Sequence, residues 1–348
     1  MNYITLIFLI ISIKLVAQET FQTEMNQLLQ HFPPRTEVAI AVINQDKVQF
    51  YGYLKDDDTI QAISNEHHVF EIGSLSKVFT STLLAISSEK KQIKLNAPIQ
   101  NFFDFKLKIK DKINLIQLAN HTAGLGRLPS NILFTATDIN NIYKNYKPSD
   151  LEYFLKNEMR LYEKPGTNYD YSNTGAGLLG YILGKAHQSD YSTILQEQIT
   201  IPLNMKNTYL NYQQVDSNLV VALNSSGELT NYWEMDVLQG AGGIYSTVND
   251  LSKFMIAHLD TLNSAYQKTH ISTFTISSTM KIGLGWHILS FDDSSKEILW
   301  HNGATGSFTS SMALDVANQK GIVILSNCPF TNNETQYLDE FIINFIKK

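Results

Sequence analysis

Two apolar, β-rich stretches lie near the start of the chain. Residues Glu37–Ile43 (EVAIAVI) and Lys47–Tyr53 (KVQFYGY) are rich in β-branched and aromatic side chains, which favour strands. Asn44-Gln45-Asp46 between them has residue types common in tight turns. The pattern therefore predicts a β-hairpin, preceded by a short helix around residues 24–32 that ends at Pro33-Pro34.

The last third of the chain returns to this β-rich pattern. Four apolar runs cover residues 283–289, 297–300, 309–315 and 321–326, and Asn318-Gln319-Lys320 provides a turn between the last two. From about residue 334 to 346 the apolar positions fall on one helical face. These runs predict consecutive antiparallel strands followed by a closing amphipathic helix.

The middle of the chain has a helical pattern. One helix is predicted from about Ser74 to Ser88, and helical segments alternate with loops from about residue 91 to 226. Strands at both ends with helices between them indicate an α+β fold. We expect an antiparallel β-sheet built from both termini and flanked by helices, with an α-rich insertion over about residues 91–226.

The N-terminal residues have the pattern of a targeting segment. Ile4–Ile13 is a continuous apolar run, shorter than the roughly 20 residues that span a bilayer. Its length and position are typical of the core of a secretory signal peptide. We expect a signal peptide over residues 1–17, cleaved after Ala17, and one folded domain over residues 18–348. An uncleaved membrane anchor is the alternative.

Composition narrows the functional classes. The 348 residues are 43% hydrophobic and 17% charged, which fits a packed core rather than a disordered chain. The net charge of −6 and the absence of any block of Lys or Arg argue against nucleic acid as a partner. Cys328 is the only cysteine, which excludes an intrachain disulfide and a cysteine-rich metal site. Glu66-His67-His68 lacks the spacing of a metal motif, so no metal or other cofactor is expected.

The first candidate for chemistry is the pair Ser74 and Lys77 at the start of the predicted central helix. Residues three apart on a helix face the same side. A serine hydroxyl becomes a good nucleophile when a neighbouring base takes its proton, and a lysine with a lowered pKa can be that base. An S-x-x-K string is common by chance, so these two residues alone would be interpreted as a helix cap and a solvated lysine.

Two further strings accompany this pair. Tyr171-Ser172-Asn173 lies in a loop before a helical run, where Tyr171 offers a phenol and Asn173 offers an amide. Residues 300–306 (WHNGATG) follow a predicted strand, and their glycines would let a substrate backbone approach closely. Read singly, these strings are an ordinary loop tyrosine, a capping asparagine and a glycine turn.

In this order, the three elements resemble the penicillin-recognising serine hydrolases: low-molecular-weight D-Ala-D-Ala peptidases, class C β-lactamases and related esterases. Residues 117–125 (QLANHTAGL), 240–251 (GAGGIYSTVNDL) and 283–286 (GLGW) also resemble that family. The resemblance covers nearly all of the chain after residue 17. The middle motif, Y-S-N, is far from Ser74 in sequence, which points away from the class A enzymes.

The resemblance implies roles for individual residues. Ser74 would attack an amide, lactam or ester carbonyl, while Lys77 and Tyr171 exchange the protons, the base being left open between them. Asn173 would hydrogen-bond the acyl side chain of the substrate. The N–H groups of Ser74 and Ala304 would form the oxyanion hole, each contributing about 3–4 kcal/mol.

The resemblance also implies that the strand around residue 301 borders the substrate. Gly303 would let the substrate approach this strand closely. His301 occupies the position where many β-lactamases have lysine; it would bind a substrate carboxylate if protonated, or polarise the proton relay from Tyr171. Among relatives, histidine here is more usual in peptidases and esterases than in class C β-lactamases.

The resulting hypothesis is an exported serine hydrolase that works through an acyl-enzyme. The expected activity is D-alanyl-D-alanine carboxypeptidase or endopeptidase hydrolysis of peptidoglycan peptides, together with penicillin binding. The alternatives are a class C-like β-lactamase, an esterase and, more distantly, an inactive ligand-binding relative. The expected partners are small-molecule or peptide substrates, with the enzyme peripheral to the cell wall and without a stable protein partner.

Overall fold

The computed structural model describes residues 21–57, 59–291, 296–328 and 334–348. The predicted signal peptide, residues 1–17, lies outside the described residues. Residues 21–30 are helical, as the sequence predicts for this region. Within the described residues, no helix combines the length and the apolar character needed to cross a bilayer.

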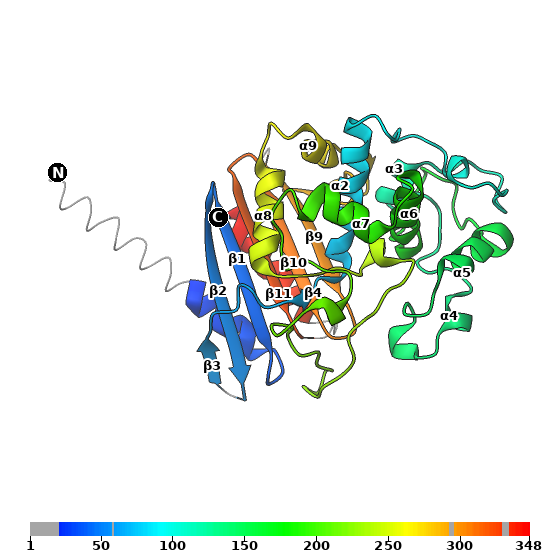
Figure 1. Cartoon of the computed structure of the whole chain (residues 1–348). Helices are drawn as coiled ribbons and strands as arrows, with labels where there is room; N and C mark the ends of the chain where they lie inside the picture. The colour runs from blue at the N-terminus through cyan, green and yellow to red at the C-terminus, as the bar shows by residue number, and fades with distance from the viewer. Residues whose placement is uncertain (1–20, 58, 292–295, 329–333) are drawn as a thin grey trace.

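The sheet at the centre of the fold joins the two ends of the chain (Figure 1). Its described strands are antiparallel and lie in the order β3-β2-β1-β11-β10-β9-β8-β7-β6. The N-terminal hairpin is completed by a C-terminal strand, since Ile40 of β1 pairs with Ile324 of β11. The strands are β1 (Glu37–Asn44), β2 (Lys47–Asp56), β3 (Thr59–Ala62), β6 (Phe274–Thr275), β7 (Met280–Ile282), β8 (His287–Ser290), β9 (Glu297–Ala304), β10 (Thr309–Asp315) and β11 (Lys320–Ser326). The predicted α+β fold is confirmed.

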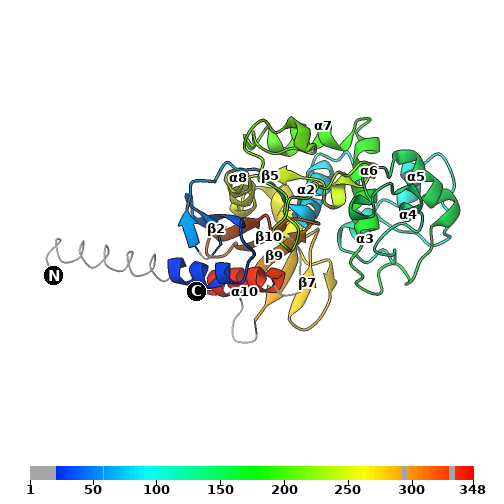
Figure 2. The ribbon, with the colours of Figure 1, turned by 90° about the horizontal axis from the view of Figure 1, so that it is seen from below.

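Both faces of this sheet are covered. Successive side chains of a strand point to opposite faces, and along β1 Ala39 and Ala41 enter one core while Val38 and Ile40 enter another. The first core contains residues of α2 (Ser76–Glu89) and α8 (Val248–Leu259). The second contains residues of the N-terminal helix and of α10 (Glu334–Lys347), which lie side by side in Figure 2.

The segment between β3 and β6 supplies most of the helices. Figure 1 shows the greater part of them beside the sheet, with α2 between the sheet and this helical half. The further helices are α3 (Leu115–Ala119), α4 (Ile132–Thr135), α5 (Pro148–Tyr153), α6 (Asn173–Ala186), α7 (Tyr191–Leu195) and α9 (Ser264–His270). A small sheet of β4 (Phe70–Glu71) and β5 (Tyr245–Ser246) pairs the chain just before α2 with the chain just before α8.

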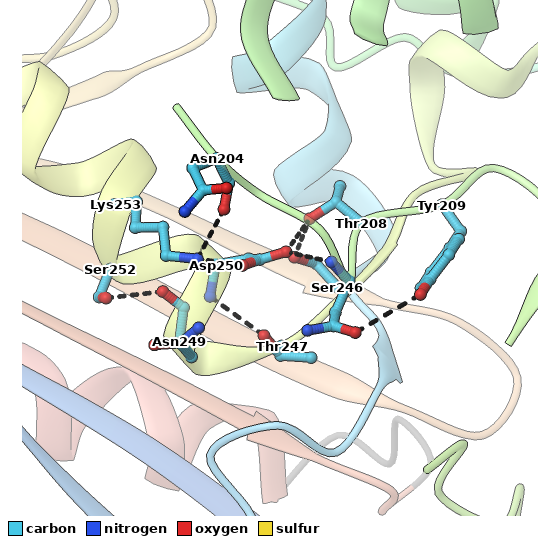
Figure 3. Close-up of polar contacts among 10 residues, drawn as sticks. Asn204, Thr208, Tyr209, Ser246, Thr247, Asn249, Asp250, Ser252 and Lys253 are labelled. Carbon is cyan, nitrogen blue, oxygen red and sulfur yellow. Dashed lines mark hydrogen bonds and ion pairs between the residues drawn. The ribbon is translucent and has the colours of Figure 1, made fainter. Parts of the chain in front are cut away.

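A polar cluster around Asp250 fixes the start of α8 (Figure 3). The Asp250 carboxylate is buried and accepts hydrogen bonds from the Asn207 backbone N–H at 2.6 Å, the Thr208 hydroxyl at 3.1 Å and the Lys253 ammonium at 2.7 Å. Lys253 also donates to the Asn204 carbonyl oxygen at 2.7 Å. These contacts tie the loop over residues 204–208 to the helix.

The structure differs locally from the sequence predictions in the last third. The run over residues 283–289 was expected to form one strand, but β8 begins only at His287 and β7 ends at Ile282. Gly283 N–H donates to the Trp286 carbonyl, and Gly285 has φ +78°, a left-handed conformation that glycine adopts readily. The first half of the run is therefore a turn between two strands.

Candidate active site

Ser74 lies in a tight turn rather than on the central helix. It belongs to a 3₁₀ turn, Gly73–Leu75, which connects β4 to α2. The helix α2 begins at Ser76, two residues after the start expected at about Ser74. Gly73 has φ +50°, which favours glycine. The turn leaves Ser74 partly exposed while its neighbours Gly73 and Leu75 are buried.

The backbones on either side of Ser74 and Ala304 approach very closely. A Cβ atom on Gly73 would lie 2.8 Å from the Ala304 nitrogen, and a Cβ atom on Gly303 would lie 2.8 Å from the Ser74 nitrogen. A side chain at either glycine would therefore clash with backbone. The structure brings the two N–H groups expected to form an oxyanion hole to the same place.

Lys77 is buried beside Ser74. Its ammonium donates to the Ser74 hydroxyl at 2.9 Å and to the Ala241 carbonyl at 2.7 Å, and only 2% of the residue is exposed. Among the described residues no carboxylate forms an ion pair with it. Burial, followed by the nearby Arg127 charge, holds the pKa of Lys77 well below its usual range. An amine in this state can take a proton from the hydroxyl that it contacts.

Tyr171 faces the same hydroxyl from the helical half. The Ser74 hydroxyl lies close enough to its phenol to oppose the effect of burial on the pKa of Tyr171, and the Lys77 Nζ atom lies 4.7 Å from the Tyr171 ring centroid. Burial raises the pKa of Tyr171, which keeps the phenol protonated at neutral pH. His121 holds this loop, because its Nδ1 atom accepts a hydrogen bond from the Ser172 N–H at 3.2 Å and its ring lies 4.4 Å from the Tyr171 ring.

Asn173 is the first residue of α6, and Ser172 is the residue that caps this helix. The Asn173 amide nitrogen donates to the Tyr143 hydroxyl at 2.8 Å, and its buried amide oxygen has no hydrogen-bond partner in the described structure. The Tyr143 ring lies 5.3 Å from the Trp233 ring. The amide nitrogen thus fixes the Asn173 side chain, while the amide oxygen remains able to accept a hydrogen bond.

His301 lies beneath the site on β9. It is fully buried, and its Nδ1 atom donates to the Asn302 carbonyl at 2.6 Å, with the tautomer assigned from this contact. Its Nε2 atom is buried without a partner in the described structure. Burial holds the pKa of His301 well below its usual range. A neutral buried imidazole is a poor carboxylate ligand, so the geometry favours the second expected role, beside Tyr171, whose ring is 6.3 Å away.

Next to His301, a second imidazole pairs with a tyrosine. The Tyr169 hydroxyl and the His287 Nε2 atom are 2.8 Å apart, and the His287 and His301 rings are 5.3 Å apart. Burial lowers the pKa of His287 to about 4. Both imidazoles are therefore neutral at physiological pH. Across the described residues, no three His, Cys, Asp or Glu side chains are grouped so as to hold a metal ion.

A cavity of about 320 Å³ opens at Ser74. Residues from the Ser74 turn, the two loops of the helical half and the strands β8 and β9 surround it. They are Ser74, Arg127, Tyr169, Tyr171, His287, Trp300, Asn302, Gly303 and Ala304. Lys77, Asn173 and His301 lie outside this lining. The Asn302 amide points away to Asp339 of α10, at 2.7 Å.

Glu71 is a buried carboxyl group just before the Ser74 turn. It accepts a hydrogen bond from the Trp233 N–H at 2.6 Å and contacts Thr305, which follows Ala304. Burial raises the pKa of Glu71 to about 7, against the opposing effect of these hydrogen bonds. Glu71 thus links the Ser74 turn to the loop that carries Trp233 and to the end of β9.

The structure therefore gathers Ser74, Lys77, Tyr171, Gly303 and Ala304 at one point. Sequence reasoning did not assign roles to Glu71, Tyr169, His287 or Arg127. A signal existed for Arg127, which is one of only three arginines and lies two residues after the string over residues 117–125. Glu71, Tyr169 and His287 give no such signal, because the residues that they contact come from distant parts of the chain.

Comparison with known proteins places this site in a family. The family model described as Beta-lactamase matches residues 25–345. A protein named Beta-lactamase from Escherichia coli (strain K12) is 24% identical over 85% of both chains. A protein named D-alanyl-D-alanine-carboxypeptidase/endopeptidase AmpH from the same strain is 26% identical, over 85% of this chain and 80% of its own.

A solved structure has the same fold. The crystal structure of a Beta-Lactamase/D-Alanine Carboxypeptidase from Pseudomonas syringae superposes with a TM-score of 0.76 at 23% identity. The match covers 94% of this chain and 98% of that chain. With a family match across most of its length, this chain belongs to the beta-lactamase family and is a serine hydrolase of the β-lactamase and DD-peptidase type.

Proposed function

We propose that this chain hydrolyses D-alanyl-D-alanine peptides of peptidoglycan through an acyl-enzyme on Ser74. The observation that carries the proposal is the contact between the Nζ atom of the buried Lys77 and the Ser74 hydroxyl at 2.9 Å, with the Tyr171 phenol close to Ser74. A buried lysine without a counter-ion is costly to the fold. Its retention beside a partly exposed serine in a cavity supports a chemical role.

The pKa directions of Lys77 and Tyr171 support one order of proton transfers. Lys77, with its lowered pKa, accepts the Ser74 proton as the oxygen attacks the carbonyl carbon. The N–H groups of Ser74 and Ala304 stabilise the oxyanion. Tyr171, whose raised pKa keeps it protonated, gives its proton to the departing amine as the C–N bond breaks, and takes the proton held by Lys77. Water then releases the acyl group by the reverse sequence.

One feature supports a peptidase over a β-lactamase. His301 is neutral and buried at the position where the family's β-lactamases often carry lysine. Relatives named for each of the two activities match over 85% of this chain and do not separate them. Hydrolysis of β-lactams is the second candidate, favoured by the relative named Beta-lactamase.

One experiment separates the two candidates. D-alanine release from an acylated L-Lys-D-Ala-D-Ala tripeptide is measured beside the hydrolysis of benzylpenicillin, with Ser74→Ala as the control. The proposal expects Ser74-dependent release of D-alanine and slow consumption of penicillin, with the acyl group retained. Rapid penicillin turnover without release of D-alanine would contradict it in favour of the β-lactamase.

The proposed substrate lies outside the cytoplasm, so the proposal includes export. It is supported by the apolar run Ile4–Ile13 and the small residue Ala17. Mass measurement of the N-terminus of protein from an extracytoplasmic fraction tests this part. A chain beginning at Gln18 is expected, and a chain that retains residues 1–17 would favour the anchor.

A further inference from the structure

Arg127 is the charged side chain at the mouth of the cavity that opens at Ser74. It is exposed, lines the same cavity as Ser74 and Ala304, and its guanidinium carbon lies 5.3 Å from the Tyr171 ring centroid. Its backbone is fixed, because the Arg127 carbonyl accepts hydrogen bonds from the N–H groups of Asn173 at 2.9 Å and Thr174 at 3.1 Å. The side chain therefore starts from a rigid point beside the reacting hydroxyl.

Arg127 is also the charge that the cavity offers to a ligand. Within the described ranges, its guanidinium forms no ion pair and no side-chain hydrogen bond. The other basic groups around the cavity differ: Lys77 is buried behind Ser74, and His287 and His301 are buried imidazoles. An unpaired guanidinium beside a partly exposed serine is a ready ligand for an anion.

We propose that Arg127 binds a carboxylate carried by the substrate and thereby selects charged substrates. The planar guanidinium presents parallel N–H groups that match the two oxygens of a carboxylate. The inference rests on the proposed function, in which the leaving residue of a carboxypeptidase substrate has a free carboxylate. In this proposal Arg127, and not the buried His301, binds the negative charge of the substrate.

The same position allows a different role, which the test must separate. Arg127 lowers the pKa of Lys77 through its charge, so removing it changes the proton relay as well. An effect on the relay acts on every substrate alike. An effect on recognition acts on charged substrates alone and changes the ratio between matched pairs.

Two matched pairs of substrates measure the ratio of kcat/KM between a charged and a neutral substrate. In the first pair, hippuryl thioglycolate carries a carboxylate on its leaving group and the corresponding thioglycolamide carries a neutral amide. In the second pair, the 4-nitrophenyl monoester of adipate carries a carboxylate on its acyl group and 4-nitrophenyl hexanoate carries none. The variants are Arg127→Gln and Arg127→Lys. Arg160→Gln is the matched control, because Arg160 is exposed and lies outside the cavity lining.

The expected result is a fall of about tenfold or more in the charged-to-neutral ratio of kcat/KM for Arg127→Gln, mainly through KM. Arg127→Lys keeps only part of the ratio, because the charge remains while the planar pair of N–H donors is lost, and Arg160→Gln leaves it unchanged. A fall in the first pair places the carboxylate on the leaving group, and a fall in the second pair places it on the acyl group.

An equal loss for both members of each pair would overturn the inference and leave Arg127 as a part of the proton relay. So would a wild-type protein without preference for, or without activity on, the charged members. Failure of the proposed peptidase activity gives a different pattern, namely Ser74-dependent hydrolysis of these esters without release of D-alanine from the tripeptide. The Arg127 ratio can still be measured in that case.

Discussion

Two lysine contacts in this molecule, one at a buried carboxylate and one at the reactive serine, lead to opposite conclusions. Lys253 meets the buried carboxylate of Asp250, which two further donors also satisfy (Figure 3). Lys77 meets only a hydroxyl and a carbonyl oxygen, and the described structure gives it no counter-ion. The first arrangement balances its charge and stabilises the fold. The second leaves Lys77 without a balancing charge, and burial followed by the Arg127 charge holds the pKa of Lys77 well below its usual range.

The surroundings of the two lysines also differ in how fully their buried polar atoms are hydrogen-bonded. Near Tyr171, the buried side-chain atoms without a hydrogen-bond partner in the described structure include His121 Nε2, His301 Nε2 and Asn173 Oδ1. The side chains of the Asp250 cluster contribute no such atom. Buried polar groups are usually paired, so the unpaired atoms near Tyr171 are candidate partners for a ligand or water.

The largest expected effect comes from removing the unbalanced charge. Lys77→Met should lower kcat/KM by about 10³-fold or more, because the base is lost. It should also raise the free energy of unfolding by about 1–3 kcal/mol at pH 7, because no charge remains to be desolvated. Activity assays and urea denaturation measure the two effects, and a variant that loses both activity and stability would contradict the comparison.

The pH dependence sharpens this prediction. The pKa of Lys77 is lower in the folded state than its usual 10.5, so between these two values the unfolded chain binds more protons and stability rises with pH. The stability advantage of Lys77→Met over the wild type should therefore shrink as the pH rises toward about 10. An advantage that stays constant with pH would show that packing, rather than charge, is its cause.

Removing the balanced charge should have the opposite signature. Asp250→Ala should lower the free energy of unfolding by about 3 kcal/mol, because the donors of Asn207, Thr208 and Lys253 lose their acceptor. The kcat of the folded fraction should stay within about twofold of the wild type, because the cluster does not touch the cavity. Urea denaturation combined with titration of active sites measures both, and a large loss of kcat in fully folded protein would contradict this assignment.

Glu71 is a third buried ionisable group, whose carboxyl group has hydrogen-bond partners but no ion pair in the described structure. Its pKa is raised from 4.5 to about 7, so the folded state binds more protons between these values and stability falls as the pH rises from about 4.5 to 7. Glu71→Gln should remove about 2–3 kcal/mol of this pH dependence. Thermal unfolding measured from pH 5 to 8 tests this, with parallel curves for variant and wild type as the contrary result.

The smallest effect is expected at a neutral polar contact in which neither lysine takes part. Asn114 caps α3 and forms a reciprocal pair with Gln117, at 3.0 and 2.9 Å. Asn114→Ala should cost about 1 kcal/mol of stability and leave the activity unchanged. A loss of activity in this variant would contradict the expectation that this cap acts on stability alone.

The sheet was predictable from sequence because its strands alternate or run apolar over their whole length, as in residues 309–315 and 321–326. The turn over residues 283–286 was not, because its apolar residues conceal the left-handed Gly285. The reactive residues were predictable as motifs. The partners that set their protonation were not, because Ala241 and Arg127 reach Lys77 from sequence distances that no local pattern encodes.

The central claim is that Ser74 becomes acylated. The most direct test is intact-mass spectrometry of the purified protein mixed with benzylpenicillin and quenched in acid after short and long times, followed by peptide mapping. The account predicts a mass gain equal to one whole penicillin molecule, because the lactam ring opens without losing atoms, located on the peptide that contains Ser74 and absent from Ser74→Ala. An adduct that persists in Ser74→Ala, or no adduct at any time, would contradict it.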